Sequence, residues 1–282
     1  MKAKLKLELA KAKREGYAVP AFNFDNLEMM KGIIEASEEE KSPVILMVTE
    51  SAAKYIGIEI VFALSLKAAE EAQIPVVLHW DHGFDINLIK RACDVGFSSV
   101  MLDASLKTFE ENVKETKEVV EYARTRDVDV ESEIGHVGGK EDDRDTSNKK
   151  YTSLEDAIAF ENKTQIDALA IAIGTSHGLN KSKIELQFQL LKELGEKIKA
   201  PLVLHGASQV SLSDLQKAIS LGITKINIGT DLKIAACNGI KNWLTDHPNE
   251  YDTRKYGRSS IDEIKNEVRK KIRAFGSNNR YK

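Results

Sequence analysis

Eight short apolar runs alternate along the chain with longer segments in which apolar residues recur at helical spacing. The runs, which are rich in β-branched residues, are Ala18–Asn23, Pro43–Thr49, Pro75–Asp81, Ser98–Asp103, Asp129–Ile134, Ala168–Ile173, Pro201–His205 and Lys225–Ile228. The clearest helical segments are Asn26–Glu40, Tyr55–Ala72, Phe109–Arg124, Ser211–Leu221 and one near Ile261–Phe275. Strict alternation predicts a parallel sheet, and eight repeats predict that the sheet closes. We therefore expect an α/β fold, a single (β/α)8 TIM barrel.

The length of 282 residues is compatible with one domain, because barrels often use about 250 residues. No linker interrupts the alternation, so we expect one barrel domain over residues 1–282. One segment breaks the rhythm: residues 135–153, GHVGGKEDDRDTSNKKYTS, are polar and show no helical pattern before Leu154. A loop of this length inside a compact domain is usually functional or disordered.

The composition excludes several classes of partner. A net charge of -3 with 30% charged residues gives no polyelectrolyte character, so neither nucleic acid nor an acidic membrane surface is expected as a partner. Cys93 and Cys237 lie in helical patterns without a C-x-x-C pair, which fits a reducing compartment. No apolar run approaches the roughly 18 residues of a membrane helix, and the first residues do not resemble a signal peptide. We expect a soluble, cytoplasmic protein.

Polar residues collect where the predicted strands end. In barrels of this kind the active site lies at the carboxyl ends of the strands, and the amino ends here carry nothing comparable. These positions are Asn23, Asp81-His82-Gly83, Asp103-Ala104-Ser105, Glu131 and Glu133, Gly174-Thr175-Ser176-His177-Gly178, His205-Gly206-Ala207-Ser208 and Asn227-Ile228-Gly229-Thr230.

Three of the six histidines, His82, His177 and His205, follow three different strands and can converge above the barrel. Three neutral imidazoles with an open fourth position are typical of a catalytic zinc site. Each histidine alone is explained more simply as a hydrogen-bonded loop residue, but the three together favour a metal. His79, inside a strand, is expected to pack or to support the site, while the loop residue His136 and the surface residue His247 carry less weight.

Glycines follow two of these histidines. Gly178 and Gly206 would let backbone amides approach an anion, and Ser208 and Thr230 would add hydroxyl groups. The alternative is that these glycines only make turns, but a phosphate site after the last two strands is the recurring arrangement in barrels. The sequence lacks a G-x-x-x-x-G-K-[ST] motif, so a nucleoside triphosphate is not implied.

With these motifs in place, the chain resembles the class II fructose/tagatose-bisphosphate aldolases with shorter chains. The similarity runs from about Ala18 to Phe275, and the motifs occur in the family's order. They are VPAFNF, VVLHWDHG, SVMLDAS, VESEIGHVGGKEDD, AIAIGTSHG, PLVLHGAS, KINIGTDL and IRAFGS. The resemblance implies cleavage of fructose 1,6-bisphosphate to dihydroxyacetone phosphate and glyceraldehyde 3-phosphate, and a homodimer or homotetramer.

The resemblance also implies the site residues. His82, His177 and His205 would bind Zn²⁺, and Asp81 would be the acid/base beside it. Glu141, after the paired glycines, would deliver a proton to the enediolate carbon, although its charged surroundings are typical of a solvated loop. Asp103 and Glu133 would support the metal or act as alternative ligands. Substrate would contact Asn23, Thr49, Gly178, Gly206, Ala207, Ser208, Asn227, Ile228, Gly229 and Thr230, with a monovalent cation near the phosphate site.

The sequence departs from the family's pattern at several positions. Lys140 stands where many relatives have a second glutamate or glutamine, Gln209 stands where they have a glycine, and Thr49-Glu50-Ser51 where they have serine-glutamate-glycine. Because of these changes, the family's pattern does not identify which residues contact the second phosphate or which configuration at C4 of the substrate is preferred. Arg280 would reach a phosphate or, as the simpler expectation, lie in a frayed tail.

Several other functions compete with fructose 1,6-bisphosphate cleavage. Within the family, the substrate could instead be tagatose 1,6-bisphosphate or the phosphorylated keto-deoxy acid of inositol catabolism. A zinc hydrolase on the same barrel usually takes an H-x-H pair from its first strand, where this chain offers only Asn23. A noncatalytic phosphosugar-binding barrel would have little need of three histidines, Asp81 and Glu141 together.

Overall fold

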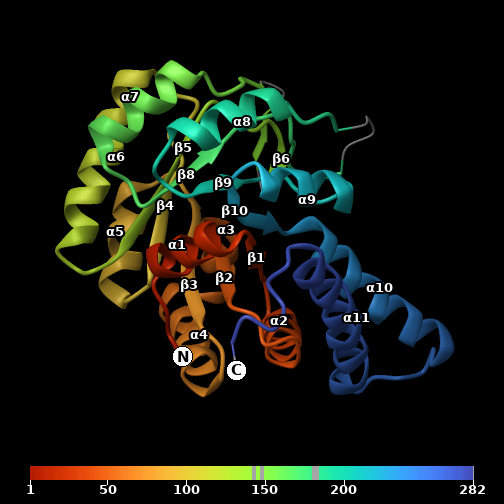
Figure 1. Cartoon of the computed structure of the whole chain (residues 1–282). Coiled ribbons are helices and arrows are strands. Elements are labelled where there is room, and N and C mark those ends of the chain that lie inside the picture. The colour runs from red at the N-terminus through yellow and green to blue at the C-terminus, as the bar shows by residue number, and fades with distance from the viewer. Residues whose placement is uncertain (142–143, 147–148, 180–183, 282) are drawn as a thin grey trace.

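The computed structural model describes residues 1–141, 144–146, 149–179 and 184–281, with the side chains of residues 141 and 144–146 excepted. In this part of the chain, eight parallel strands close into a barrel in the order β1, β10, β9, β8, β5, β4, β3 and β2 (Figure 1). The predicted α/β TIM barrel is therefore confirmed. Its strands are β1 (Val19–Asn23), β2 (Val44–Thr49), β3 (Val76–Gly83), β4 (Ser99–Leu102), β5 (Asp129–Ile134), β8 (Ala168–Ile171), β9 (Leu202–Leu204) and β10 (Ile223–Ile228).

Helices surround the barrel, and several begin after a capping side chain. Asn26, Thr108, Ser153 and Ser211 each accept a hydrogen bond from a backbone N–H in the first turn of the helix that follows. No helix in the described ranges combines the length and apolarity that a membrane crossing requires. The helices are α1 (Leu5–Glu15), α2 (Leu27–Glu39), α3 (Glu50–Ile56), α4 (Ile58–Glu71), α5 (Ile86–Val95), α6 (Phe109–Arg124), α7 (Leu154–Thr164), α8 (Phe188–Lys197), α9 (Leu212–Ser220), α10 (Thr230–Asp246) and α11 (Thr253–Ala274).

Three helical segments differ from the sequence prediction. The expected helix Tyr55–Ala72 is wrong as a single element, because Gly57 adopts φ +96 and separates α3 from α4. The last helix starts at Thr253, earlier than expected, because the Asp252 side chain caps it. Helix α1 was not predicted at all. The described residues of the long loop form no helix but contain the antiparallel hairpin of β6 (Gly139–Glu141) and β7 (Arg144–Thr146).

The barrel interior changes from apolar to polar along its axis. At the amino end, Leu5 and Leu9 of α1 pack with Val19, Ile45 and Val77, so the helix plugs this end. Alternate residues of a strand face the same side, and following these strands toward their carboxyl ends gives polar interior positions. They are His79, Asp81, Glu131, Glu133, Lys225 and Asn227, all buried. The fold thus gathers polar groups at one mouth of the barrel.

The C-terminal tail is attached at the opposite end. The backbone amides of Asn279 and Arg280 donate to Glu40 and Lys41 at 2.8 and 3.0 Å. The Arg280 guanidinium lies 4.4 Å from the centre of the Tyr17 ring, which precedes β1. The expectation of a frayed tail is therefore wrong. Because Tyr17 marks the amino end of the barrel, Arg280 lies away from the carboxyl-end mouth of its own chain.

Candidate active site

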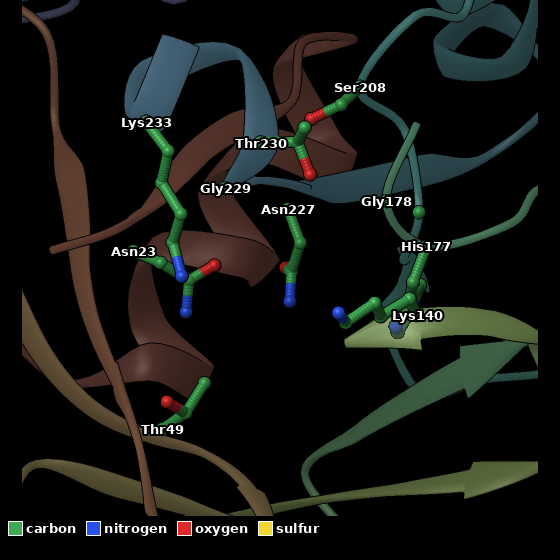
Figure 2. Close-up of a pocket in the computed structure, with 11 residues that line it drawn as sticks. Asn23, Thr49, Lys140, His177, Gly178, Ser208, Asn227, Gly229, Thr230 and Lys233 are labelled. Carbon is green, nitrogen blue, oxygen red and sulfur yellow. The ribbon is translucent and has the colours of Figure 1, made fainter. Parts of the chain in front are cut away.

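A pocket of about 220 Å³ opens at the carboxyl mouth of the barrel. In Figure 2, Asn23 and Thr49 lie on one side and Lys140, His177 and Gly178 on the other. None of the described residues that line it is acidic. In the part of the chain that the structure describes, the lining residues are Asn23, Thr49, Lys140, His177, Gly178, Gly206, Ser208, Asn227, Gly229, Thr230 and Lys233. Eight of the ten predicted substrate contacts are therefore in one pocket, whereas Ala207 and Ile228 are fully buried and do not line it.

The three predicted zinc ligands come together beside this pocket. One ring nitrogen from each of His82, His177 and His205 lies within 4.8 Å of the others. The ring centres of His82 and His205 are 4.5 Å apart, and those of His82 and His177 are 5.0 Å apart. These histidines are all buried and come from β3 and from the loops after β8 and β9.

Carboxylates contact the outer nitrogens of two of these rings. His82 Nδ1 lies 3.1 Å from Asp103 Oδ2, and His205 Nε2 lies 2.8 Å from Glu131 Oε1. When each outer nitrogen carries the proton that its carboxylate accepts, the inner nitrogens present lone pairs. These inner nitrogens, His82 Nε2 and His205 Nδ1, are only 2.6 Å apart. Both nitrogens face the same point, and His177 adds a third ring nitrogen within 4.8 Å, so the donor set fits a metal ion.

Burial favours the neutral form of His205 and His79. It lowers the pKa of His205, and neighbouring His82 lowers it further. Burial and the positive charge of Lys225 also place the pKa of His79 well below its ordinary value. Burial alone would raise the pKa of Glu131, but Lys225 and His205 lower it below its usual range. A neutral imidazole is the form that binds metal.

A strand irregularity directs Asp81 and His82 to the same site. Consecutive residues of a regular strand face opposite sides, so only one of them would point into the barrel. Here the pairing of β3 with β4 shifts register between Trp80 and Gly83, and His82 has φ +43. A bulge with a left-handed residue turns the His82 side chain back toward the interior.

Asp81 is fully buried and held by two amides. Asn23 Nδ2 donates to Oδ2 at 2.8 Å, and Asn227 Nδ2 donates to Oδ1 at 3.2 Å. Because Asn23 and Asn227 line the pocket, the carboxylate lies directly beneath its floor. The arrangement places an oriented proton acceptor beside the histidine cluster.

A second group of potential ligands shares His82. It consists of His82, Asp103 and Glu133, whose donor atoms also lie within 4.8 Å of one another. Although burial alone would raise the pKa of Asp103, hydrogen bonds from His82 and Ser105 lower it below its ordinary value. The Ser105 hydroxyl also lies 2.8 Å from His136 Nδ1. Asp103 and Glu133 thus adjoin the histidine cluster.

The long loop packs against one of the histidines. His177 N donates to Gly138 O at 2.9 Å, and a Cβ on Gly139 would lie 2.4 Å from His177 O. Only glycine fits at this contact. Glu141 ends β6, but its side chain lies outside the described part of the chain. The role predicted for that side chain stays a prediction.

Replacing Gly206 by alanine should disturb the site directly. Gly206 has φ +60, and an added Cβ would lie 2.9 Å from His177 Cδ2 and 2.7 Å from Ser176 C. We expect displacement of His177 and a loss of about 10²-fold in kcat, as for a misplaced catalytic group. Gly16→Ala is the matched control, because Gly16 has φ +70 but no atom within 4 Å of the added Cβ. Equal turnover by the two variants would contradict the prediction.

Comparison with known proteins decides the family. A model of the family described as fructose-bisphosphate aldolase class-II matches residues 3–280. This chain belongs to the class II fructose-bisphosphate aldolase family. The predicted family and class of enzyme, an aldolase and hence a lyase, are therefore confirmed.

The relatives and solved structures of this class II aldolase match it over nearly its full length. A fructose-bisphosphate aldolase of Staphylococcus aureus (strain Mu50 / ATCC 700699) is 43% identical over 99% of this chain and 98% of its own. A sulfofructosephosphate aldolase of Alkalicoccus urumqiensis is 40% identical over 98% and 96%. The crystal structure of the YdjI aldolase from Escherichia coli K12 is 35% identical, with a TM-score of 0.89 over 100% of both chains.

Sequence reasoning missed several residues of this class II aldolase site. Lys140 and Lys233 line the pocket, but the sequence marks Lys140 only as a departure from the family pattern and gives no signal for Lys233. The contact of His136 with Ser105 was also missed. Lys225 lies in the predicted strand Lys225–Ile228 and in the motif KINIGTDL but has no predicted role, and its charge inside an apolar strand is the available signal.

Proposed function

We propose that this chain, as one barrel domain over residues 1–282, catalyses zinc-dependent, reversible cleavage of fructose 1,6-bisphosphate to dihydroxyacetone phosphate and glyceraldehyde 3-phosphate. The observation that carries the proposal is the inward-facing nitrogen pair of His82 and His205, beside a pocket with two lysines and no acidic lining residue among those described. The lysines favour a substrate with more than one anionic group. Lys233 also contacts Asp25 at 3.0 Å.

The phosphate of the dihydroxyacetone half would bind where β9 and β10 end. Helix α10 begins at Thr230, so the positive end of its dipole favours an anion there. Ser208 lies against this helix start, because its Oγ accepts from Asp231 N at 3.4 Å. Gly206 and Gly229 complete the lining of that side and leave room for the phosphate oxygens.

Asp81 would perform the first proton transfer. Zinc held by His82, His177 and His205 would supply Lewis-acid polarisation of the ketose carbonyl. Asp81 would accept the proton of the C4 hydroxyl as the C3–C4 bond breaks, which releases the aldehyde and leaves the enediolate of dihydroxyacetone phosphate. The amides of Asn23 and Asn227 orient Asp81 for this step. Glu141 would then return a proton to the enediolate carbon.

The proposal extends to the surroundings of the enzyme. Family membership supports sugar phosphates as its small-molecule partners. We further propose a cytoplasmic homodimer or homotetramer without nucleic-acid or membrane partners, and a monovalent cation near the phosphate site. Gel filtration with light scattering tests the assembly, and a monomer at working concentration would contradict it.

A coupled assay of the zinc-loaded protein tests the activity. Fructose 1,6-bisphosphate, tagatose 1,6-bisphosphate and the phosphorylated keto-deoxy acid would be compared at equal concentration, each with a chelated control. Because one relative is a sulfofructosephosphate aldolase, a sulfonated ketose phosphate completes the panel. We expect chelator-sensitive cleavage with the highest kcat/KM for fructose 1,6-bisphosphate. A higher kcat/KM for another compound would make that compound the substrate. Binding of these sugar phosphates without cleavage would support a noncatalytic barrel.

A further inference from the structure

Three ionisable side chains lie inside the barrel, one layer below the pocket. His79 of β3, Glu131 of β5 and Lys225 of β10 have no exposed surface. Barrel interiors are usually filled by layers of branched aliphatic side chains. In this chain, Val77 and Val203 are interior residues of that usual kind. The charged groups therefore occupy space that apolar side chains normally fill.

The contacts of Glu131 connect this layer to the histidine cluster. One carboxylate oxygen, Oε2, lies 2.8 Å from Lys225 Nζ, and the other, Oε1, lies 2.8 Å from His205 Nε2. The chain of contacts from Lys225 through Glu131 to His205 thus crosses the barrel from β10 to β5 and on to the residue after β9. His79 Nε2 is farther away, at 3.9 Å from Glu131 Oε2.

Stability does not explain a buried ion pair at this position. Removing two charges from water is expensive, and replacing such a pair by apolar residues of similar size is often neutral or stabilising. The pair does, however, have a specific geometric effect. A carboxylate fixed at His205 Nε2 selects the tautomer that carries its proton there, which leaves the Nδ1 lone pair pointing at His82 Nε2, 2.6 Å away.

We propose that Lys225 is a positioning residue of the metal site: it fixes the Glu131 carboxylate, which in turn fixes the tautomer and ring orientation of His205. The inference rests on the proposed zinc site. Lys225 is not among the described residues that line the pocket, and its effect on the tautomer and orientation of the His205 ring passes through Glu131. Lys225 is the first residue of the motif KINIGTDL, but the motif alone does not reveal this role, because it depends on β5 and β10 facing each other across the barrel.

Lys225→Met and Glu131→Gln test the proposal, with zinc affinity measured by competition with a chromophoric chelator. Methionine keeps the length of lysine without its charge, and glutamine keeps the shape of glutamate. We expect each variant to bind zinc about 10- to 100-fold more weakly. Thr224→Val is the matched control, because Thr224 is buried on the same strand but bonds Leu202 O. Wild-type affinity in Lys225→Met would overturn the inference.

The double variant distinguishes positioning from general damage. Because Lys225 acts through Glu131, Lys225→Met in the Glu131→Gln background should weaken zinc binding by less than twofold more. A further loss equal to that of Lys225→Met alone would mean an independent effect and would sink the proposal. If Lys225→Met does not fold, Lys225→Arg supplies the test, because it keeps the charge and should retain zinc affinity within about threefold.

A readout without metal separates this inference from the proposed function. Imidazole nitrogen NMR of the metal-free wild type should show His205 protonated at Nε2, and Glu131→Gln should give a mixture of tautomers. An unchanged tautomer in Glu131→Gln would contradict the inference even if the enzyme cleaves its substrate. Conversely, wild-type protein that shows the expected His205 tautomer but binds no zinc would contradict the proposed function. The inference that Glu131 determines the His205 tautomer would still hold.

Discussion

Replacing Asp81 by alanine is expected to lower kcat by about 10²- to 10⁴-fold while zinc stays bound, because the variant loses the proposed general base and keeps all three histidines. Asp81 is the carboxylate directly beneath the pocket floor, between the amides of Asn23 and Asn227. Turnover of fructose 1,6-bisphosphate and the zinc content of the same preparation check the prediction.

The same substitution should have a separate, smaller effect on stability. Without the carboxylate, the Asn23 and Asn227 amides each lose a buried acceptor, which costs about 1–3 kcal/mol for each group left unsatisfied. Thermal unfolding measures this cost independently of turnover. Asp85→Asn is the control, because Asp85 only caps α5 and asparagine caps equally well. Near-normal cleavage by Asp81→Ala would remove Asp81 from its proposed role.

The sequence predicted the barrel and most of the pocket, because strand ends in a closed parallel sheet meet at one mouth. Asn23, Ser208 and Thr230 lie far apart in the chain, yet all three line the pocket. Their place at the carboxyl mouth could be predicted because each one follows the end of an apolar run, and the end of a run can be recognised from the neighbouring residues alone. Helix α1 was not predicted in this way. The lysines and leucines at the start of the chain do not resemble a signal peptide, and they do not by themselves predict a helix that closes the amino end of the barrel.

Features that depend on register or backbone irregularity could not be predicted. Strand alternation places Asp81 and His82 on opposite faces, and only the shifted pairing near Gly83 brings both to the site. The contact between Glu131 and Lys225 requires two strands to face each other across the barrel, and no spacing in the sequence encodes that. Sequence periodicity specifies which face a residue takes but not its partner across the interior.

Removal of zinc by a chelator should reduce activity by about 10³-fold or more, because Lewis-acid stabilisation contributes several kcal/mol to the transition state. Added zinc should restore activity without refolding. The physical reason is that Asp103 and Glu131 hold the His82 and His205 rings through their outer nitrogens, which zinc does not use. Full activity in the chelated protein would sink the proposed mechanism.

His205→Ala makes the corresponding test inside the protein. The substitution removes the inner Nδ1, a proposed zinc ligand, and also leaves the buried Glu131 carboxylate without its histidine partner. We expect the purified variant to contain almost no zinc and to gain no activity when zinc is added. His247→Ala is the control, since His247 is exposed and stacks on Trp243 at 4.3 Å. Stoichiometric zinc in His205→Ala would mean that the ion is held elsewhere, and the group of His82, Asp103 and Glu133 would then become the site to test.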